Sequence, residues 1–516
     1  MNILFATSEC APFIKTGGLA DVAGALPKAL AGNGHDVRVV LPLYEGIGEE
    51  WRSQMTYLQC FHITLAWRSP YCGIFELKRD GVTYWFVDNE YYFKRSNIYG
   101  HYDDGERFAY FSRAVVESMG WLNWHPDVLH CNDWQTALVP IYLLEERHRI
   151  PQLCDTKSVF TIHNIEYQGR YGSQTLKDVF GLNDGYFNEH MLAYHGDVNL
   201  MKGAIYAADY VTTVSPTYAD ELQYSFYAHG LEGVIADNRH KLRGILNGID
   251  TEVYDPWRDK GLTKFFSARQ MAGKKNCKAA LQQMSGLREN PDAPIIACVS
   301  RLVRHKGFDL VTAAIHEIMG MDVQMIVLGT GDWNYEEAFR QAQNQYPGRF
   351  AAHMMYSPNL STAIYGGADL FLMPSISEPC GLSQMIAMRY GTVPIVRETG
   401  GLKDTVRPYE AWRDSGTGFT FANYSSADML HVIREAVYLY KDYPDAFARL
   451  RQRAMEQDFS WNRSAGEYLK IYASVTGVSA EPEQDAQASA AKASGASDAP
   501  DAAPAPQPAP ASESAA

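Results

Sequence analysis

The stretch MNILFATSECAPFIKTGGLADVAGALPKAL, residues 1–30, joins a short apolar run to a longer helical pattern through a pair of glycines. Ile3–Ala6 has the length and apolar character of a buried strand, and the residues up to Leu30 suit a helix. Gly17 and Gly18 mark the turn between the two. A strand followed directly by a helix is the building unit of a parallel sheet covered by helices, so this stretch predicts an α/β fold.

The same alternation of strand and helix patterns continues through most of the chain. In the first half we expect further strands at Val37–Leu41, Val128–Cys131, Val159–Ile162 and Val211–Val214. The series then restarts, with strands expected at Ile295–Val299, Met325–Leu328, Leu370–Met373 and Val393–Val396. Two series of about 200 residues predict two Rossmann-like domains, each with a parallel sheet that is covered on both faces.

Turn and composition signals divide the chain further. The dipeptide Asn247-Gly248 follows a strand pattern, so we place the joint between the domains at residues 246 and 247. Residues 67–92 alternate apolar and polar side chains around Arg79-Asp80-Gly81, which predicts an antiparallel hairpin in the first domain. Residues 479–516 are rich in Ala and Pro and lack large apolar side chains, so we expect them to be disordered.

The composition excludes several classes of protein. The 516 residues carry a formal net charge of −14, so a broad basic surface for nucleic acid is not expected. The N-terminus does not resemble a signal peptide, and no apolar run approaches ~18 residues, so we expect a soluble cytoplasmic protein without a membrane partner. The 8 Cys show no disulfide or CxxC pattern, and the sequence contains no HExxH motif or other zinc-ligand spacing.

The first candidate site motif is KTGGLADV, residues 15–22, at the turn quoted above. Gly17 and Gly18 allow a ligand to approach the backbone, and the helix that follows offers unpaired N–H groups to an anion. Lys15 adds a positive charge at the same place. The motif is neither a Walker A nor a GxGxxG sequence, so a phosphate cradle and simple close packing both stay open as interpretations.

Two further motifs follow strands of the second series. SRLVRHKG, residues 300–307, carries Arg301 and Lys306 at the carboxyl end of a strand, where α/β folds bind ligands. The two cations could neutralise a diphosphate without a metal, and a solvated basic loop is the alternative. In SEPCGL, residues 377–382, the carboxylate of Glu378 could hold sugar hydroxyls, or it could be an ordinary acid in the first turn of a helix.

Single cysteine and histidine residues complete the candidate set. Cys380 has no His or Asn partner pattern beside it, so we interpret it as a positioning thiol rather than a nucleophile. HCNDW, residues 130–134, and TIHNI, residues 161–165, end two strands and bring Asp133 and His163 to one edge of the first sheet. A histidine at such a place can also be a hydrogen-bonded core residue, so both interpretations are kept.

Taken together, the motifs follow an order that resembles bacterial glycogen synthases and plant starch synthases. The resemblance spans about residues 1–475. Within them this chain carries, in the same order as the family, KTGGLADV, HCNDW, TIHN, LNGID (246–250), SRLxxxKG, SEPCGLSQ and ETGGLKDTV (398–406). The resemblance implies a GT-B fold, in which two Rossmann-like domains, residues 1–246 and 247–457, face each other across a deep cleft. It also implies that residues 458–478 hold a final helix, near Trp461–Ser474, that crosses back to the first domain.

The resemblance implies an activity as well. Glucose would pass from ADP-glucose to the nonreducing end of an α-1,4-glucan such as glycogen, with retention of configuration and without a metal or other cofactor. The family is usually assigned a front-face mechanism, in which the departing diphosphate helps to deprotonate the acceptor and the backbone carbonyl of His163 faces the oxocarbenium.

The site residues are carried over from the same resemblance. The pyrophosphate would be held by Lys15, Gly17, Gly18, Arg301 and Lys306. The transferred glucose would be surrounded by His163, Asn247, Glu378, Cys380 and Gly381. Asp21 and Asp133 would line the cleft, and Tyr356 would stack on adenine. The residues expected to be catalytic are Lys15, His163, Arg301, Lys306, Glu378 and Cys380.

Other activities remain as alternatives at this stage. A transferase of the same fold could use UDP-glucose or another nucleotide sugar, although the pairing of KTGGL with EPCGL favours ADP-glucose. A glucan phosphorylase would need a lysine segment for pyridoxal phosphate, and we find no such segment. An inactive glucan-binding scaffold would bind glycogen without transferring sugar, but the charges at Lys15, Arg301, Lys306 and Glu378 argue against it.

Overall fold

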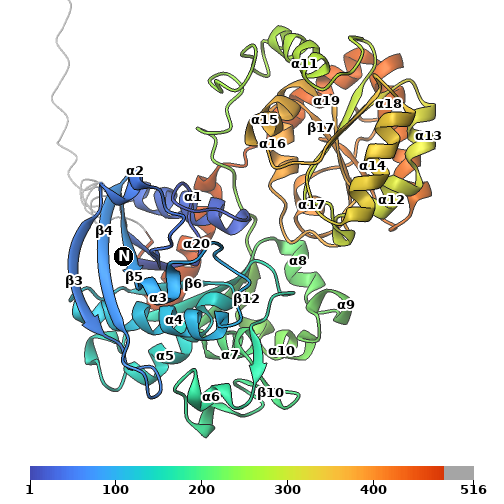
Figure 1. Cartoon of the computed structure of the whole chain (residues 1–516). Coiled ribbons are helices and arrows are strands. Elements are labelled where there is room, and N and C mark those ends of the chain that lie inside the picture. Colours follow the sequence, from blue (N-terminus) through green and yellow to red (C-terminus); the bar gives the residue numbers. More distant parts are fainter. Residues whose placement is uncertain (481–516) are drawn as a thin grey trace, which may run out of the picture.

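The computed structural model describes residues 1–480 and contains two large sheets flanked by helices (Figure 1). The first sheet has nine strands in the order β12-β11-β7-β6-β1-β2-β5-β4-β3. In that order the strands span Leu242–Gly244, Tyr210–Thr213, Lys157–Ile162, Val128–Asn132, Asn2–Ala6, Asp36–Pro42, Val82–Asp88, Tyr71–Arg79 and Thr56–His62. Neighbouring strands pair in parallel, except that β4 is antiparallel to both β5 and β3.

The second sheet has six strands, all parallel, in the order β15-β14-β13-β16-β17-β18. Its strands span Phe350–His353, Gln324–Leu328, Ile295–Val299, Leu370–Met373, Val393–Arg397 and Phe419–Phe421. The central strands are almost wholly buried, as expected for a sheet that has helices on both faces.

The predicted α/β fold class and the predicted strands are confirmed. Each of the nine stretches named from the sequence coincides with a strand, and the predicted hairpin is β4 and β5, joined at Asp80 and Gly81 with φ of 52 and 78°. In the two large sheets the sequence patterns missed β3, β12, β15 and β18. All four are edge strands. An edge strand is short or half exposed, so its apolar pattern is weaker.

Helices cover both sheets. Those that follow strands of the first sheet span Gly18–Gly32 (α1), Glu49–Arg52 (α2), Glu90–Phe93 (α3), Asp104–Trp121 (α4), Leu138–Glu146 (α5), Thr175–Asp178 (α6), Leu200–Ala207 (α7), Pro216–Glu221 (α8), Ser225–Ala228 (α9) and Glu232–Asp237 (α10). Those of the second half span Ala272–Met284 (α11), Phe308–Ala313 (α12), Ile315–Gly320 (α13), Trp333–Gln345 (α14), Pro358–Gly367 (α15), Ser383–Arg389 (α16), Gly400–Thr405 (α17), Ser426–Asp442 (α18) and Pro444–Met455 (α19). A small antiparallel sheet is formed by Arg170–Gly172 (β8), Ala193–Tyr194 (β9) and Asp197–Asn199 (β10).

The last helix, α20 (Trp461–Thr476), packs against the first half of the chain, although it follows the second half in sequence (Figure 1). It contacts α1, and the hydroxyl of Tyr472 lies 2.6 Å from Nδ1 of His130 on β6. Nε2 of His130 lies 2.6 Å from Oγ1 of Thr161, so the buried ring is hydrogen-bonded at both nitrogens. His130 is therefore a core residue that joins α20 to the first sheet.

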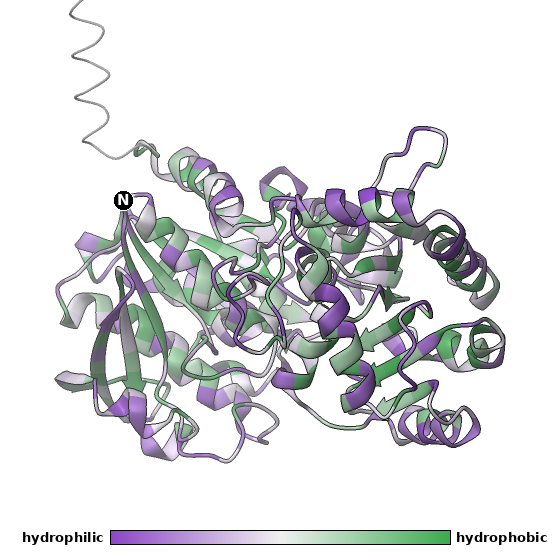
Figure 2. Cartoon of the chain, turned by 90° about the horizontal axis from the view of Figure 1, so that it is seen from above, coloured by the Kyte–Doolittle hydropathy of each residue, from purple (hydrophilic) through white to green (hydrophobic). Residues whose placement is uncertain are grey.

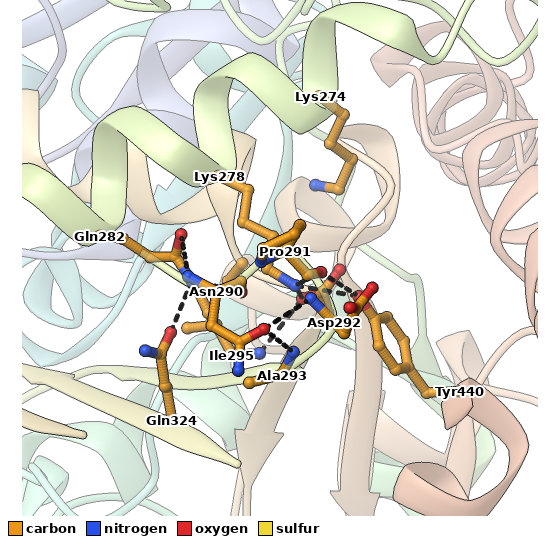
Figure 3. Close-up of polar contacts among 12 residues, drawn as sticks. Lys274, Lys278, Gln282, Asn290, Pro291, Asp292, Ala293, Ile295, Gln324 and Tyr440 are labelled. Atoms are coloured by element: carbon orange, nitrogen blue, oxygen red, sulfur yellow. Dashed lines mark hydrogen bonds and ion pairs between the residues drawn. The ribbon is translucent and has the colours of Figure 1, made fainter. Parts of the chain in front are cut away.

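The first helix of the second half, α11, is held against its sheet by buried charges (Figure 3). Nζ of Lys274 donates to the carbonyl oxygens of Tyr365 and Tyr390 and to Thr392 Oγ1. One turn later, Nζ of Lys278 lies 2.8 Å from Oδ2 of Asp369. These bonds satisfy cations that burial would otherwise destabilise, and they fix α11 at the end of the sheet opposite the strand carboxyl ends.

The boundary at residues 246 and 247 stays a prediction. The first sheet ends at Gly244 and the next strand of a large sheet begins at Ile295. Apart from its first two residues, the predicted disordered tail, 479–516, lies outside the described residues. Coloured by hydropathy, the inner strands are mostly hydrophobic, and hydrophilic residues are frequent on the outer helices (Figure 2). Within residues 1–480, no helix is long and apolar enough to cross a membrane.

Candidate functional site

The candidate residues gather at the carboxyl ends of parallel strands in both sheets. In the first half Asp133 follows β6 and His163 follows β7. In the second half Arg301 comes soon after β13 and Glu378 after β16. Carboxyl ends of parallel strands share one edge of a sheet, which is where open α/β sheets bind ligands.

The two halves approach each other at this edge. A Cβ on Gly18, at the start of α1, would lie 3.8 Å from the side chain of Leu382 in the SEPCGL motif. Ser215 Oγ donates to the carbonyl oxygen of Pro379 at 2.5 Å. The backbone N–H of Asn247 lies against the thiol of Cys380. Motifs that are more than 130 residues apart in the sequence therefore form one site.

Two short helices hold the halves together beside this site. Asp404, near the end of α17, accepts hydrogen bonds from the backbone N–H and the hydroxyl of Thr217 at the start of α8, at 2.9 and 2.7 Å. Glu221, at the end of α8, accepts from Thr399 Oγ1 at 2.8 Å and from the N–H of Gly400 at 3.0 Å, at the start of α17. Each helix thus supplies a carboxylate to the N-terminus of the other, where the helix dipole favours negative charge.

The loop that carries Lys15 is organised by Glu9, a residue that the sequence patterns did not single out. Oε2 of the buried Glu9 accepts from the N–H and hydroxyl of Thr16, at 2.6 and 2.8 Å, and from the N–H of Gly17 at 3.2 Å. Burial raises the pKa of Glu9, while the hydrogen bonds from Thr16 and Gly17 lower it. The N–H of Gly17 is thus already bonded to a carboxylate, and Glu9 sets the shape of the turn.

Lys15 forms an ion pair within its own motif. Its Nζ lies 2.6 Å from Oδ1 of Asp21, in the first turn of α1. Burial raises the pKa of Asp21 and the charge of Lys15 lowers it, while Asp250 raises it again. Lys15 is half exposed, so its ammonium group can turn toward an anion.

Asp133 and His163 form a connected polar group at the edge of the first sheet. Asp133 has φ of 57° and ψ of −179°, a conformation that is strained for any residue other than glycine. Its Oδ1 accepts from the N–H of His163 at 2.7 Å and of Asn164 at 3.3 Å. Burial raises the pKa of Asp133 to about 7 despite these two bonds.

The imidazole of His163 is neutral and oriented. Its Nε2 lies 2.9 Å from Oδ1 of Asn132, whose Nδ2 donates to the carbonyl oxygen of Ala6 at 3.0 Å. Because Asn132 thereby presents its oxygen, Nε2 carries the hydrogen and Nδ1 is left as an acceptor. Burial lowers the pKa of His163 to about 3, so the ring stays uncharged at neutral pH.

In the second half Lys306 and Glu378 form a close ion pair. Nζ of Lys306 lies 2.8 and 2.7 Å from the two carboxylate oxygens of Glu378, and Ser375 Oγ donates to Oε2 at 3.0 Å. Arg301 is exposed, and no ion pair joins it to another residue within 1–480. The site therefore offers one cation that is held by a carboxylate and one that is open to a ligand.

The turn that contains Cys380 is packed tightly against the ETGGL motif. A Cβ on Gly400 would lie 2.0 Å from the carbonyl oxygen of Glu378, and one on Gly401 would lie 2.1 Å from that of Cys380. Only glycine allows this contact. Gly381 has φ of 72°, which also favours glycine. Burial raises the pKa of Cys380 to about 12, although the N–H of Asn247 lowers it, so the thiol stays protonated.

The remaining candidates differ in their surroundings. Asn247 is buried, and its Oδ1 finds no hydrogen-bond partner among the described residues. Such an orphaned acceptor is expected where a ligand supplies the missing donor. Tyr356 lies on the loop between β15 and α15 and is 81% exposed, so its ring is free to stack on a planar group.

Sequence reasoning missed the residues that hold the motifs in place. Glu9, Thr217, Glu221 and Asp404 are acids or a hydroxyl close to turns, and such residues are common in any loop. A carboxylate within ten residues of a Gly-Gly turn was a weak local signal for Glu9. The two cross-capping pairs span nearly 180 residues or more, so no local pattern could show them.

Family models match both halves of the chain. The model described as the starch synthase catalytic domain matches residues 2–237, and the model for glycosyl transferases group 1 matches residues 279–454. The glycogen synthase of Geobacillus thermodenitrificans is 51% identical over 473 residues, which cover 92% of this chain and 97% of that protein. The glycogen synthase of Bacillus cereus strain Q1 is 48% identical over 92% of this chain and 100% of its own length.

Two solved structures resemble this chain, one of them a starch synthase. The catalytic domain of starch synthase IV from Arabidopsis thaliana, bound to ADP and acarbose, superposes with a TM-score of 0.86 at 34% identity. The match covers 92% of this chain and 99% of that one. Sucrose-phosphate synthase from Thermosynechococcus elongatus superposes with a TM-score of 0.59 at 16% identity, which shows a shared fold.

Proposed function

The chain belongs to the glycogen synthase family of glucosyltransferases, and from that premise we propose how its site carries out the transfer. The donor is ADP-glucose, and the acceptor is the nonreducing end of an α-1,4-glucan. The products are ADP and a glucan that is longer by one glucose, with the anomeric configuration retained. The starch synthase structure with ADP and acarbose supports a nucleotide and a sugar-like ligand in this site.

The pair formed by Lys306 and Glu378 beside Arg301 is the observation that carries the proposal. Cleavage of the glucose–phosphate bond leaves additional negative charge on the diphosphate. Arg301 and Lys306 stabilise this charge from the second half, and Lys15 does so from the first. Fixed cations act most strongly where the charge is largest, which is in the transition state. In this proposal they take the role that a metal plays in other transferases.

The groups around the transferred glucose fit a reaction without a covalent enzyme intermediate. The thiol of Cys380 is protonated and buried, so it orients the sugar rather than attacking it. Nδ1 of the neutral His163 accepts a hydrogen bond from a sugar hydroxyl, and Oδ1 of Asn247 accepts another. Glu378 balances positive charge that develops on the sugar ring. The departing diphosphate then removes the proton of the acceptor hydroxyl on the same face.

We also propose the remaining assignments made from the sequence. Residues 1–246 and 247–457 are the two domains, and residues 458–478 hold the helix that crosses back to the first domain. The protein acts in the cytoplasm. Asp21 and Asp133 line the cleft, where Gly17, Gly18 and Gly381 give the ligand close access to the backbone. Tyr356 stacks on the adenine ring of the donor.

The decisive experiment measures incorporation of labelled glucose into glycogen from ADP-glucose and UDP-glucose in parallel. Efficient incorporation from ADP-glucose, with clearly slower incorporation from UDP-glucose, is the expected result. Equal or faster transfer from UDP-glucose would contradict the donor assignment. Binding of glycogen without any transfer would indicate a scaffold instead of an enzyme.

A further inference from the structure

Gln384, in the first turn of α16, is a fully buried amide that the proposed reaction does not use. Its Nε2 donates to the carbonyl oxygens of Cys380 and Gly381 at 3.1 and 2.9 Å, and to Oγ1 of Thr405 at 3.1 Å. Carbonyl oxygens can only accept, so the nitrogen must face them, and Oε1 is the atom left over. Oε1 finds no hydrogen-bond partner among the described residues. A buried acceptor without a partner lowers stability, so stability alone is a weak reason for glutamine at this position.

The hydroxyl of the buried Thr405 anchors this amide to α17. Thr405 Oγ1 donates its single hydrogen to the carbonyl oxygen of Gly401 at 2.6 Å, which leaves the oxygen as an acceptor for Gln384. The neighbouring residue, Asp404, accepts from the hydroxyl of Thr217 on α8. Gln384 is therefore fixed to the same helix that contacts the first half of the molecule.

Two peptide units of the site are oriented by these bonds. In a trans peptide the N–H points opposite to the preceding carbonyl, so the N–H groups of Gly381 and Leu382 face away from Gln384. Within residues 1–480, no hydrogen bond joins either N–H group to another residue. The turn lies where the two halves meet, because the side chain of Leu382 is next to Gly18. Gln384 thus holds two open donors at the site, directed away from the buried amide.

We propose that Gln384 is a positioning residue, which holds this turn so that the N–H groups of Gly381 and Leu382 and the thiol of Cys380 meet oxygen atoms of the transferred glucose. The proposal rests on the proposed function, because that function supplies the sugar. Gln384 is 0% exposed, so it acts through the backbone of the turn and does not contact the donor. Thr405 acts in the same way, one bond further from the sugar.

Loss of this positioning should slow the transfer more than it weakens nucleotide binding. Without Nε2, the carbonyl oxygens of Cys380 and Gly381 lose their donor, and the two peptide units can rotate. The N–H groups would then have to be reoriented in each turnover, and a preorganised donor is worth most in the transition state. The proposed contacts of Lys15, Arg301 and Lys306 with the diphosphate are left in place.

The test compares Gln384→Met, which keeps the length of the side chain but removes its donor, with a matched control. Gln282→Met is suitable because Gln282 is also buried, and its Nε2 donates to Asn290 O at 2.8 Å and to Gln324 Oε1 at 2.7 Å, far from the site (Figure 3). We expect Gln384→Met to lower kcat roughly 10- to 100-fold. Its KM for glycogen and its Kd for ADP, measured by calorimetry, should stay within about threefold of the wild type. Gln282→Met should keep the wild-type kcat.

A second pair of variants tests the same network without changing Gln384. Thr405→Val removes the hydroxyl and should lower kcat in the same direction by a smaller factor, whereas Thr405→Ser keeps the hydroxyl and should restore most of the rate. Combining Thr405→Val with Gln384→Met should lower kcat by less than the product of the two single effects, because both act on one turn.

Two results would overturn the proposal. One is a kcat of Gln384→Met equal to that of Gln282→Met, and the other is a Kd for ADP that rises as much as kcat falls. If Gln384→Met does not fold, as judged by thermal melts, equal rates of Thr405→Val and Thr405→Ser would overturn it instead. A failure of the proposed function would appear separately, as a wild type that incorporates no glucose.

Discussion

Single residues in the site differ in whether they are already bonded or still open to a ligand. Lys306 is paired with Glu378, Lys15 is paired with Asp21, and Arg301 is exposed. Residue types and spacing predicted these cations correctly as neighbours of strand ends. They could not predict the ion pairs, because Lys306 and Glu378 are 72 residues apart in sequence.

The exposed guanidinium of Arg301 gives the first prediction. Arg301→Ala should lower turnover by roughly 10²–10³, because it removes a preorganised charge from the developing diphosphate. The Tm should hardly change, since the side chain is exposed and has no ion pair among residues 1–480. Initial rates with saturating ADP-glucose, together with thermal melts, measure both effects. A variant with a near-normal rate would remove Arg301 from the mechanism.

Glu378 gives the second prediction, because its carboxylate competes with a diphosphate for Lys306. Glu378→Gln should bind ADP at least as tightly as the wild type, since Lys306 is released from its ion pair. Turnover should nevertheless fall on the order of 10²-fold or more, because the charge that balances the sugar ring is lost. Calorimetric titration with ADP and initial rates measure the two effects. Ser375→Ala, which removes only the hydroxyl bonded to Glu378, is the control and should change both values much less.

At the scale of elements, strands were predictable and contacts between distant helices were not. Central strands show apolar runs because both faces are buried, whereas the four edge strands do not. The ETGGL motif was recognised in the sequence, but its physical role is apparent only in three dimensions. Gly400 and Gly401 allow α17 to begin directly against the backbone of Glu378 and Cys380.

The cross-capping of α8 and α17 yields the third prediction. Asp404→Ala should lower the free energy of unfolding by about 1 kcal/mol, the usual value of a helix cap. Thr217→Ala should cost a similar amount, and the double variant should cost less than the sum, because both changes remove the same contact. Urea unfolding of the four proteins measures this coupling. Additive losses would mean that the contact contributes nothing.

His130 joins α20 to the first sheet and gives the fourth prediction. Burial lowers the pKa of His130 to about 3, compared with its ordinary value of 6.5. Its contribution to stability is therefore complete above pH 6.5 and is lost as the pH falls toward 3, because only the unfolded chain binds the proton. Between pH 7.5 and 5 the wild type should lose about 2 kcal/mol through this residue.

A substitution of His130 separates its contribution to the pH dependence of stability from general acid unfolding. His130→Gln should be less stable at pH 7.5, yet its unfolding midpoint should change less between pH 7.5 and 5. His431→Gln on the exposed face of α18 serves as the control and should behave like the wild type. If His130→Gln shows the same pH dependence as the wild type, another group is responsible.

At the scale of the whole molecule, the order of the motifs predicted the two-sheet architecture and the family. The relative placement of the two halves depends on contacts that have no sequence signature, such as Ser215 with Pro379 and the two capping pairs. Patterns therefore predicted what each half contains, and the structure was needed to see how the halves meet.

The fifth prediction concerns how the donor acts on both halves at once. Lys15 belongs to the first half, whereas Arg301 and Lys306 belong to the second, and all three are proposed to hold one diphosphate. Bound ADP should then draw the halves together, so the radius of gyration from small-angle X-ray scattering should decrease when ADP is added.

Lys15→Ala should still bind ADP through the second half, with an affinity reduced roughly tenfold by the loss of one charge contact. At saturating ADP this variant should show little decrease in radius. The contacts of α8 with α17 are present in the free protein and do not involve Lys15, so they would serve as the pivot. An equal decrease in Lys15→Ala would mean that the second half alone drives closure, and that Lys15 acts only in the chemical step.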